Sequence, residues 1–500
     1  MKDKVSEDIA LGSFWNFLLT LAARIGSLFF VVIIARFMLP ESFGIYSLAV
    51  SIALILLVTI DAGINQSLLK YVSEAINADN KKLASARFRY LFRLKLIITL
   101  VVSFCLILLA YPLAYFIFQK PALFLPIIFS AFFILVNSIG NFYSSYFYII
   151  RKLGYVTIKQ VIFEIIRIFG VLGIFLVVAQ QHYVIGTLGV LVISMSIALL
   201  FLVYNLYRLS PFLTEKSTES IHKEQMLRFI WSYSFIGSLL VIFGYIDTIM
   251  IGIFLEASYV GYYNLALAFV TGIWGFLNLS QILLPIFTEI KNEQIHTEFN
   301  KVFRYICMLA LPAIFGILVL GKYLIVLIKE AYLPAESPFY VLAILILIVP
   351  LIDMFTPLFS AKDKLKIIMY GVITATIMNI VLNYFFITLF LRISPIMAMV
   401  GASLSTIISQ SFYLGILMVY AKKYFNVHLE MRQIIKPLIA ALGMYFILTT
   451  INSYINDFTL LIGIAEILFG VLIYFTTLFL IKGVRTEDIA LVKHTFLRFL

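Results

Sequence analysis

The sequence predicts an all-α integral membrane protein of about fourteen transmembrane helices. Hydrophobic residues make up 63% of the 500-residue chain, against roughly 45–50% in soluble proteins. Charged residues make up only 12%, and the mean hydropathy is +1.07. With so few charged side chains, the chain cannot cover its apolar surface in water. Lipid must therefore surround most of it.

Apolar runs of about 20 residues, the length that crosses a bilayer, recur along the chain. They lie at residues 14–35, 46–69, 94–118, 123–149, 155–178, 183–205, 229–255, 265–287, 302–328, 339–360, 367–390, 395–420, 438–455 and 458–481. The longest polar stretch separates the sixth run from the seventh. We therefore expect an N-lobe at 1–206, a cytoplasmic linker at 207–228, a C-lobe at 229–421, and two accessory helices with a cytoplasmic C-terminus at 422–500.

The basic residues predict how these helices are oriented. With the N-terminus inside, the cytoplasmic segments hold 30 of the 37 Lys and Arg residues, and the opposite loops hold five. Because basic residues resist translocation, both termini are expected in the cytoplasm. The net charge of +12 is then explained by topology, and no nucleic-acid partner is expected. The remaining two basic residues, Arg24 and Arg167, lie within predicted helices.

An internal repeat relates the two lobes. FGIYSLA at 43–49 recurs as VGYYNLA at 260–266, an offset of 217 residues, and each copy lies where an odd-numbered helix turns into the next. A repeat of six helices returns the chain to the same side of the membrane, so the two halves run parallel. Two such halves can enclose a central cavity and rock against each other, which is typical of transporters.

Three segments carry a resemblance to a known family. They are GSFWNFLLTLAARIGSLFFVVIIARFMLPESFGIYSLA at 12–49, DAGINQSLLKYVSE at 61–74 and YIDTIMIGIFLEASYVGYYNLA at 245–266. The chain resembles the polysaccharide-transporter (Wzx-type) flippases of the multidrug/oligosaccharidyl-lipid/polysaccharide (MOP) exporter superfamily. This resemblance implies alternating-access transport of polyprenyl-phosphate- or pyrophosphate-linked oligosaccharides across the cytoplasmic (plasma) membrane, for surface polysaccharide or glycan assembly. Membrane lipids, glycosyltransferases and a polysaccharide polymerase are the implied partners.

Polar stripes inside the helices are candidates for the walls of the cavity. On the first helix the stripe is Ser13, Asn16, Thr20, Arg24 and Ser27, spaced by three or four residues. Arg at the bilayer centre costs roughly 2.5–3.5 kcal/mol on insertion scales, so a phosphate facing Arg24 is a fitting partner. The expected sugar ligands are Asn16, Thr20, Asn137, Asn141, Asn379 and Asn383. The alternative is that these polar groups only hydrogen-bond neighbouring helices, at about 0.6 kcal/mol each.

Acidic residues within the spans are candidates for coupling to a Na⁺ or H⁺ gradient. Glu164 and Arg167 stand three residues apart, so they either neutralise each other or form a cation site that Arg167 tunes. Asp61 and Asp247 are further candidates, for cation coordination or for hydrogen bonds between helices.

No enzyme activity, cofactor or metal site is expected. The sequence contains no Walker loop and no HExxH motif, and neither Cys105 nor Cys307 has a His or second Cys at metal-ligand spacing. A membrane scaffold or a lipid-modifying enzyme would need large soluble regions or clustered catalytic residues, which the sequence lacks. An ion gradient or the membrane potential is therefore the expected energy source.

Two other transport functions remain as alternatives. A peptidoglycan-precursor (lipid II) flippase shares the fourteen helices and an arginine like Arg24, but that family tends to carry further cavity arginines on helices two and eight, where this chain has none. A cation-coupled multidrug exporter usually has twelve spans and an acidic cavity, whereas the first helix here offers Arg24.

Overall fold

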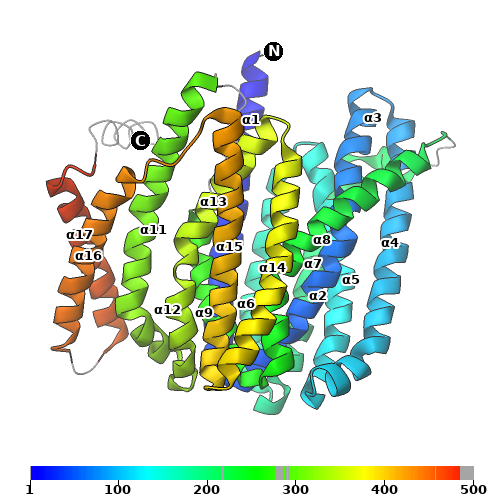
Figure 1. The fold of residues 1–500 in the computed structure, drawn as a ribbon. Helices are drawn as coiled ribbons and strands as arrows, with labels where there is room; N and C mark the ends of the chain where they lie inside the picture. The colour runs from blue at the N-terminus through cyan, green and yellow to red at the C-terminus, as the bar shows by residue number, and fades with distance from the viewer. Residues whose placement is uncertain are drawn as a thin grey trace. The chain divides into compact units, whose positions relative to one another are not determined.

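The computed structural model describes residues 2–215, 219–277, 283, 287, 290, 292–455 and 458–484. Every regular element in these residues is helical, and the long helices of each part run side by side (Figure 1). The predicted all-α membrane architecture is confirmed.

The described residues form sixteen α-helices. They are α1 (Lys2–Phe37), α2 (Pro40–Ser67), α3 (Ser73–Asn77), α4 (Lys81–Pro112), α5 (Phe124–Ile149), α6 (Leu153–Val177), α7 (Tyr183–Leu209), α8 (Lys223–Phe254), α9 (Ala257–Phe276), α11 (Asn292–Ile328), α12 (Glu336–Leu342), α13 (Leu345–Ala361), α14 (Leu365–Leu391), α15 (Pro395–Phe425), α16 (Arg432–Asn452) and α17 (Leu460–Leu480). Short π-helical turns, Leu68–Val72 and Leu113–Ile117, extend α2 and α4.

Among the described residues, eleven helices are long and apolar enough to cross a membrane, and two bent pairs raise this number to thirteen. The pairs are Lys223–Leu239 with Val241–Phe254, bent by 44°, and Glu330–Leu342 with Leu345–Ala361, bent by 46°. The chain is therefore a multi-pass membrane protein. The predicted span at 265–287 lies largely outside the described residues, so the count of fourteen stays a prediction.

Several helices extend beyond their apolar runs. α4 begins at Lys81, thirteen residues before the predicted span, because Asn80 caps its N-terminus: the Asn80 side chain accepts a hydrogen bond of 2.9 Å from the Leu83 amide. α8 begins at Lys223, inside the segment predicted as a linker. Hydropathy identifies the part of a helix that lies in lipid, whereas the helix itself continues into water.

Three basic residues assigned to cytoplasmic loops by the sequence count are buried within helices instead. Lys95 of α4 is 0% exposed, Lys159 of α6 is 5% exposed, and Arg304 of α11 is 5% exposed. The count assumed that a basic residue near the end of an apolar run lies in water. That assumption is wrong for these three. For Lys95 the reason is an ion pair with Asp61 of a neighbouring helix.

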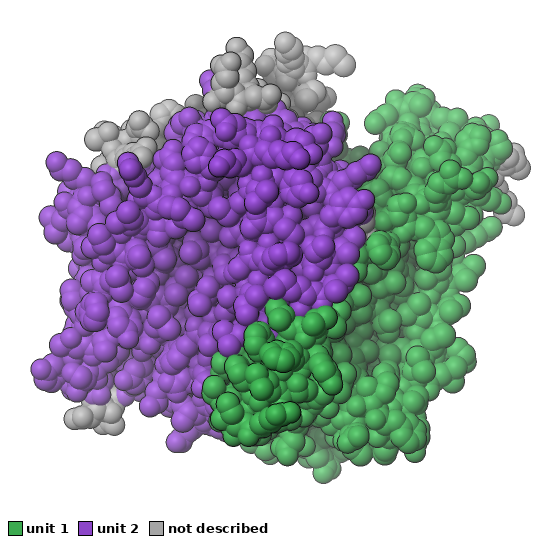
Figure 2. Space-filling model, viewed as in Figure 1, with its two compact units in different colours: residues 1–268, 380–402 green, residues 269–379, 403–500 purple. Residues whose placement is uncertain are grey.

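The chain divides into two compact units (Figure 2). One comprises Met1–Ala268 with Ile380–Ala402, and the other comprises Phe269–Asn379 with Ser403–Leu500. Helices α14 and α15 contribute residues to both units. The lobe boundaries at 206 and 229 remain predictions.

The two copies of the repeated motif meet inside the first unit, at the N-terminal ends of α2 and α9. A Cβ atom added to Gly44 would lie 1.7 Å from the carbonyl oxygen of Ala257, and one added to Gly261 would lie 2.2 Å from that of Pro40. Pro40 and Ala257 are themselves related by the repeat offset. The contact is thus pseudo-symmetric, and only glycine fits at either position because any side chain would overlap the facing backbone.

The loop between α4 and α5 is fastened to the C-terminal end of α8. The Lys120 ammonium donates hydrogen bonds to the carbonyl oxygens of Gly252, at 2.6 Å, and of Phe118, at 3.0 Å. Burial lowers the pKa of Lys120 below its ordinary value, and the carboxylate of Glu256 opposes this shift. Such a lysine contact stabilises the carbonyl end of a helix.

Candidate functional site

A polar cavity of about 770 Å³ lies within the first unit, where α1, α2, α5 and α6 face one another. Two cationic side chains, Arg24 and Lys159, line it together with one carboxylate, Asp61. The other polar groups of its wall are hydroxyls and amides, from Thr20, Ser27, Asn65, Gln66, Asn141, Ser144, Ser145, Tyr148 and Gln160. A cavity of this composition suits an anionic ligand that also carries hydroxyl groups.

Arg24 lies on α1 in the stripe expected from the sequence. Thr20, Arg24 and Ser27 all line the cavity, and the Thr20 hydroxyl donates a hydrogen bond of 2.9 Å to the backbone oxygen of Asn16. Arg24 is partly buried and makes no hydrogen bond or ion pair with any residue that the structure describes. Its guanidinium N–H groups therefore remain available for water or a ligand.

Lys159 brings a second positive charge that the sequence reasoning missed. It is 5% exposed, lines the same cavity, and has no hydrogen-bond partner within the described ranges. Lys159 lies within the apolar run at 155–178, which could have indicated a buried lysine. The count of basic residues instead assigned it to a cytoplasmic loop.

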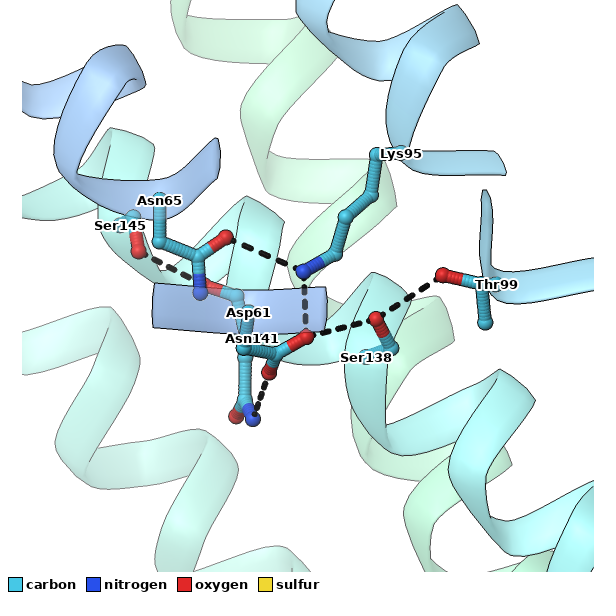
Figure 3. A network of polar contacts seen from close by, with 7 residues as sticks. All are labelled: Asp61, Asn65, Lys95, Thr99, Ser138, Asn141 and Ser145. Carbon is cyan, nitrogen blue, oxygen red and sulfur yellow. Dashed lines mark hydrogen bonds and ion pairs between the residues drawn. The ribbon is translucent and has the colours of Figure 1, made fainter. Parts of the chain in front are cut away.

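Asp61 of α2 forms the centre of a buried polar network (Figure 3). Lys95 of α4 makes an ion pair with one carboxylate oxygen of Asp61, and the Ser138 hydroxyl of α5 donates to the same oxygen at 2.7 Å. The Asn141 amide donates to the other oxygen at 2.8 Å. Lys95 also donates to the side-chain oxygen of Asn65, at 3.3 Å. The network holds α2, α4 and α5 together.

Burial makes this network sensitive to the loss of any one member. Asp61 is 6% exposed, and Lys95 and Ser138 are 0% exposed. Ser138 is 3.1 Å from the Thr99 hydroxyl, which extends the chain of contacts along α4. Both carboxylate oxygens of Asp61 accept hydrogen bonds, so the cost of burying its charge is compensated by Lys95 and the neutral donors. Lys95 was missed because its partner Asp61 lies on another helix.

Glu164 and Arg167 pair with each other on α6. They form an ion pair, and the Gln160 amide donates to the other Glu164 oxygen at 2.9 Å. The Arg167 guanidinium lies 4.2 Å from the centre of the Phe30 ring on α1. Gly26 of α1 lies so close that an added Cβ would be 2.5 Å from the Glu164 carboxyl carbon, so the pair is enclosed where α1 and α6 touch.

Removing one member of this pair is expected to destabilise the protein more than removing both. Glu164→Ala or Arg167→Ala leaves a buried charge uncompensated, at a cost of about 3–5 kcal/mol, whereas the double variant leaves none. The free energy of unfolding of the purified variants checks this expectation. The exposed pair Glu224–Arg228 is a matched control: breaking it should lower the free energy of unfolding by at most about 0.5 kcal/mol. A double variant that is no more stable than either single variant would contradict it.

Asp247 of α8 is buried beside two neutral donors. The Tyr263 hydroxyl of α9 and the Asn383 amide of α14 each donate to it at 2.7 Å, one to each carboxylate oxygen. The side-chain oxygen of Asn383 is buried without a hydrogen-bond partner in the described part of the protein. Asp247 and Asn383 were predicted separately, as a coupling residue and a sugar ligand, and the structure brings them together.

The other predicted ligands are distributed over both units. Asn141 lines the cavity, whereas Asn137 of α5 is 9% exposed and is not among the lining residues. Asn379 belongs to the second unit, where its amide donates to the Thr406 hydroxyl at 3.2 Å. Within the described ranges, no group of three or more His, Cys, Asp or Glu residues is placed to hold a metal ion.

Comparison with known proteins adds a family and a fold. The model of the family described as "Polysaccharide biosynthesis protein" matches residues 9–291. No curated protein matches the chain.

Solved structures of several transporters share the fold. The lipid II flippase MurJ, in an inward closed conformation, has a TM-score of 0.74 and 15% sequence identity, covering 94% of this chain and 98% of MurJ. An inward-facing multidrug resistance MATE family transporter of the MOP superfamily has a TM-score of 0.61 and 16% identity, covering 81% and 96%. A MOP superfamily transporter from Pyrococcus furiosus, described by the reverse polarity of its binding pocket, has a TM-score of 0.52 and 14% identity, covering 81% and 95%.

Proposed function

The chain belongs to the family of polysaccharide biosynthesis proteins, and from this premise we propose that it is a flippase. Its substrate is an oligosaccharide linked to a polyprenyl phosphate or pyrophosphate. The protein moves this substrate across the cytoplasmic membrane by alternating access, for the assembly of a surface polysaccharide or glycan. The structural neighbours are likewise transporters and a flippase, and the proposed role is transport without catalysis.

The observation that carries the proposal is the polar cavity with Arg24 in its wall. A guanidinium meets two phosphate oxygens at once and keeps its charge at any physiological pH. Around Arg24, hydroxyl and amide groups such as Thr20, Ser144 and Asn141 line the same space. These groups are suited to sugar hydroxyls, which both donate and accept hydrogen bonds. The phosphate would therefore meet Arg24, and the sugars would occupy the surrounding wall.

The energy source in this proposal is a Na⁺ or H⁺ gradient or the membrane potential. The candidate coupling residues remain Asp61, Glu164 with Arg167, and Asp247. Asp61 and Glu164 each already pair with a cationic side chain, whereas the hydrogen bonds of Asp247 to Tyr263 and Asn383 come from neutral donors. Replacing each of the three carboxylates by its amide tests which of them makes transport depend on a cation gradient.

The proposed location and partners follow from the substrate. A lipid-linked oligosaccharide is made by glycosyltransferases and extended by a polysaccharide polymerase, so these enzymes are the expected partners. The distribution of basic residues in the loops supports placing both termini in the cytoplasm.

A lipid II flippase is the second candidate, and the likeness to MurJ over 94% of this chain favours it. The cavity described here does not distinguish the two substrates, because both carry a phosphate group and sugars. A multidrug exporter for cationic drugs is less compatible with this cavity, since Arg24 and Lys159 would repel such drugs.

Flipping by purified protein separates these functions. Proteoliposomes containing a fluorescent polyprenyl-pyrophosphate oligosaccharide should expose the label to a membrane-impermeant quencher faster than protein-free liposomes do. Fluorescent lipid II and ethidium, a cationic drug, are tested in the same vesicles. Transport of the oligosaccharide lipid above lipid II supports the proposal. Faster transport of lipid II favours the second candidate, and transport of ethidium alone contradicts both.

A further inference from the structure

We propose that Lys159 is a second anion-binding group of the cavity and that, together with Arg24, it selects headgroups with two adjacent negative groups. This inference rests on the proposed function, which requires only one phosphate contact, at Arg24.

Lys159 is a buried cation without a hydrogen-bond partner among the described residues. Lys159 is 5% exposed, and nothing in the described ranges accepts a hydrogen bond from it. A buried ammonium is costly unless it is paired or solvated. Since Lys159 lines the polar cavity, the contents of that cavity are what compensates its charge.

Two other buried cations of the same unit, unlike Lys159, pair with carboxylates. Lys95 pairs with Asp61, and Arg167 pairs with Glu164. Glu164 is also the carboxylate that acts electrostatically on Lys159, but its two oxygens already accept hydrogen bonds from Arg167 and Gln160. Lys159 and Arg24 are thus available to bind a ligand, whereas Lys95 and Arg167 form ion pairs within the protein.

Lys159 and Arg24 lie on neighbouring helices at a similar height. Helices α1 and α6 pack side by side in parallel: the Thr157 hydroxyl donates to the backbone oxygen of Trp15 at 2.9 Å, and Gly26 contacts Glu164 further along. This register places Lys159 one to two helical turns from Arg24, roughly 5–10 Å along the helix axis. Two long side chains at this spacing can reach neighbouring groups of one headgroup, and their mutual repulsion is relieved when that headgroup carries two negative charges.

Two chemistries supply such a headgroup. One is a pyrophosphate linkage, and the other is a single phosphate followed by an acidic sugar. A single phosphate carrying a neutral sugar would occupy Arg24 and leave Lys159 uncompensated. The lysine ammonium, a compact point charge with three donors, suits either a phosphate or a carboxylate.

The test measures binding of defined lipids to purified protein in detergent. The ligands are undecaprenyl pyrophosphate, undecaprenyl phosphate linked to glucose, undecaprenyl phosphate linked to glucuronic acid, and undecaprenol as the uncharged control. The glucose-linked lipid is a phosphodiester with one negative charge, whereas a free phosphate monoester carries up to two. Lys159→Gln is expected to weaken binding of a two-anion lipid about tenfold, the effect of one lost charge-assisted contact, with little change for the glucose-linked monophosphate. Lys159→Arg retains the charge and should restore most of the affinity. Lys152→Gln removes an exposed lysine next to the start of α6 and should change nothing.

The outcomes separate the inference from the function it rests on. Weaker binding of the pyrophosphate lipid, the glucuronate lipid or both, with unchanged binding of the monophosphate lipid, supports the inference. Which of the two lipids is affected identifies the source of the second charge. An equal loss for all three anionic lipids, or no loss, overturns it while leaving the proposed function intact. If the unaltered protein binds no anionic lipid above undecaprenol, the proposed function itself is contradicted.

Discussion

Replacing Arg24 with alanine is expected to abolish glycan export while the protein still inserts and folds. Arg24 makes no hydrogen bond or ion pair with the described residues, so its removal leaves no partner uncompensated. Deleting it also removes a charge that costs roughly 2.5–3.5 kcal/mol at the bilayer centre. Arg24→Lys should restore export only partly, because an ammonium lacks the two-pronged contact with phosphate.

Export by a strain that lacks the native protein measures this effect, with each variant expressed at the same level. Arg208→Ala is the matched control, because Arg208 is exposed at the end of α7 and should be dispensable. Full export by Arg24→Ala would contradict the phosphate assignment and leave Arg24 with a structural role.

Lys95→Met is expected to destabilise the protein by about 3–5 kcal/mol, the cost of leaving one charge of a buried pair without its partner. Asp61 would keep only its neutral donors, Ser138 and Asn141. The double variant Asp61→Asn with Lys95→Met removes both charges and should recover much of the loss. Unfolding free energies of the two single variants and the double variant measure the coupling. Lys81→Met, at an exposed position in the first turn of α4, is the control.

Additive losses in the double variant would show that Asp61 and Lys95 do not stabilise the fold as a pair. A stable double variant also permits a transport measurement. If it still flips the substrate, Asp61 serves packing between helices rather than coupling to an ion.

The membrane fold and one wall of the cavity were predictable because each depends on a pattern within one segment. Mean hydropathy and run length identified the membrane helices, and the family match over residues 9–291 confirms the resemblance seen in three segments. On α1, spacing by three or four residues placed Thr20, Arg24 and Ser27 on one face, and all three line the cavity.

Lys159 and the Asp61–Lys95 network were not predictable, because each depends on contacts between different helices. Lys95 meets Asp61 across 34 positions of sequence. Lys159 lies near the end of an apolar run, where a basic residue usually indicates the cytoplasmic boundary. For both lysines, hydropathy reports the average environment of a window of residues, whereas burial depends on which neighbouring helix faces the side chain.

The glycine contact between α2 and α9 has the geometry of an isologous interface. In such an interface each partner presents the same surface, so residue i of one meets residue j of the other and j of the first meets i of the second. Gly44 against Ala257 and Gly261 against Pro40 follow this rule with the repeat offset in place of a second chain. Because glycine stands at both positions, the two helix backbones lie in direct contact there, with no side chain between them.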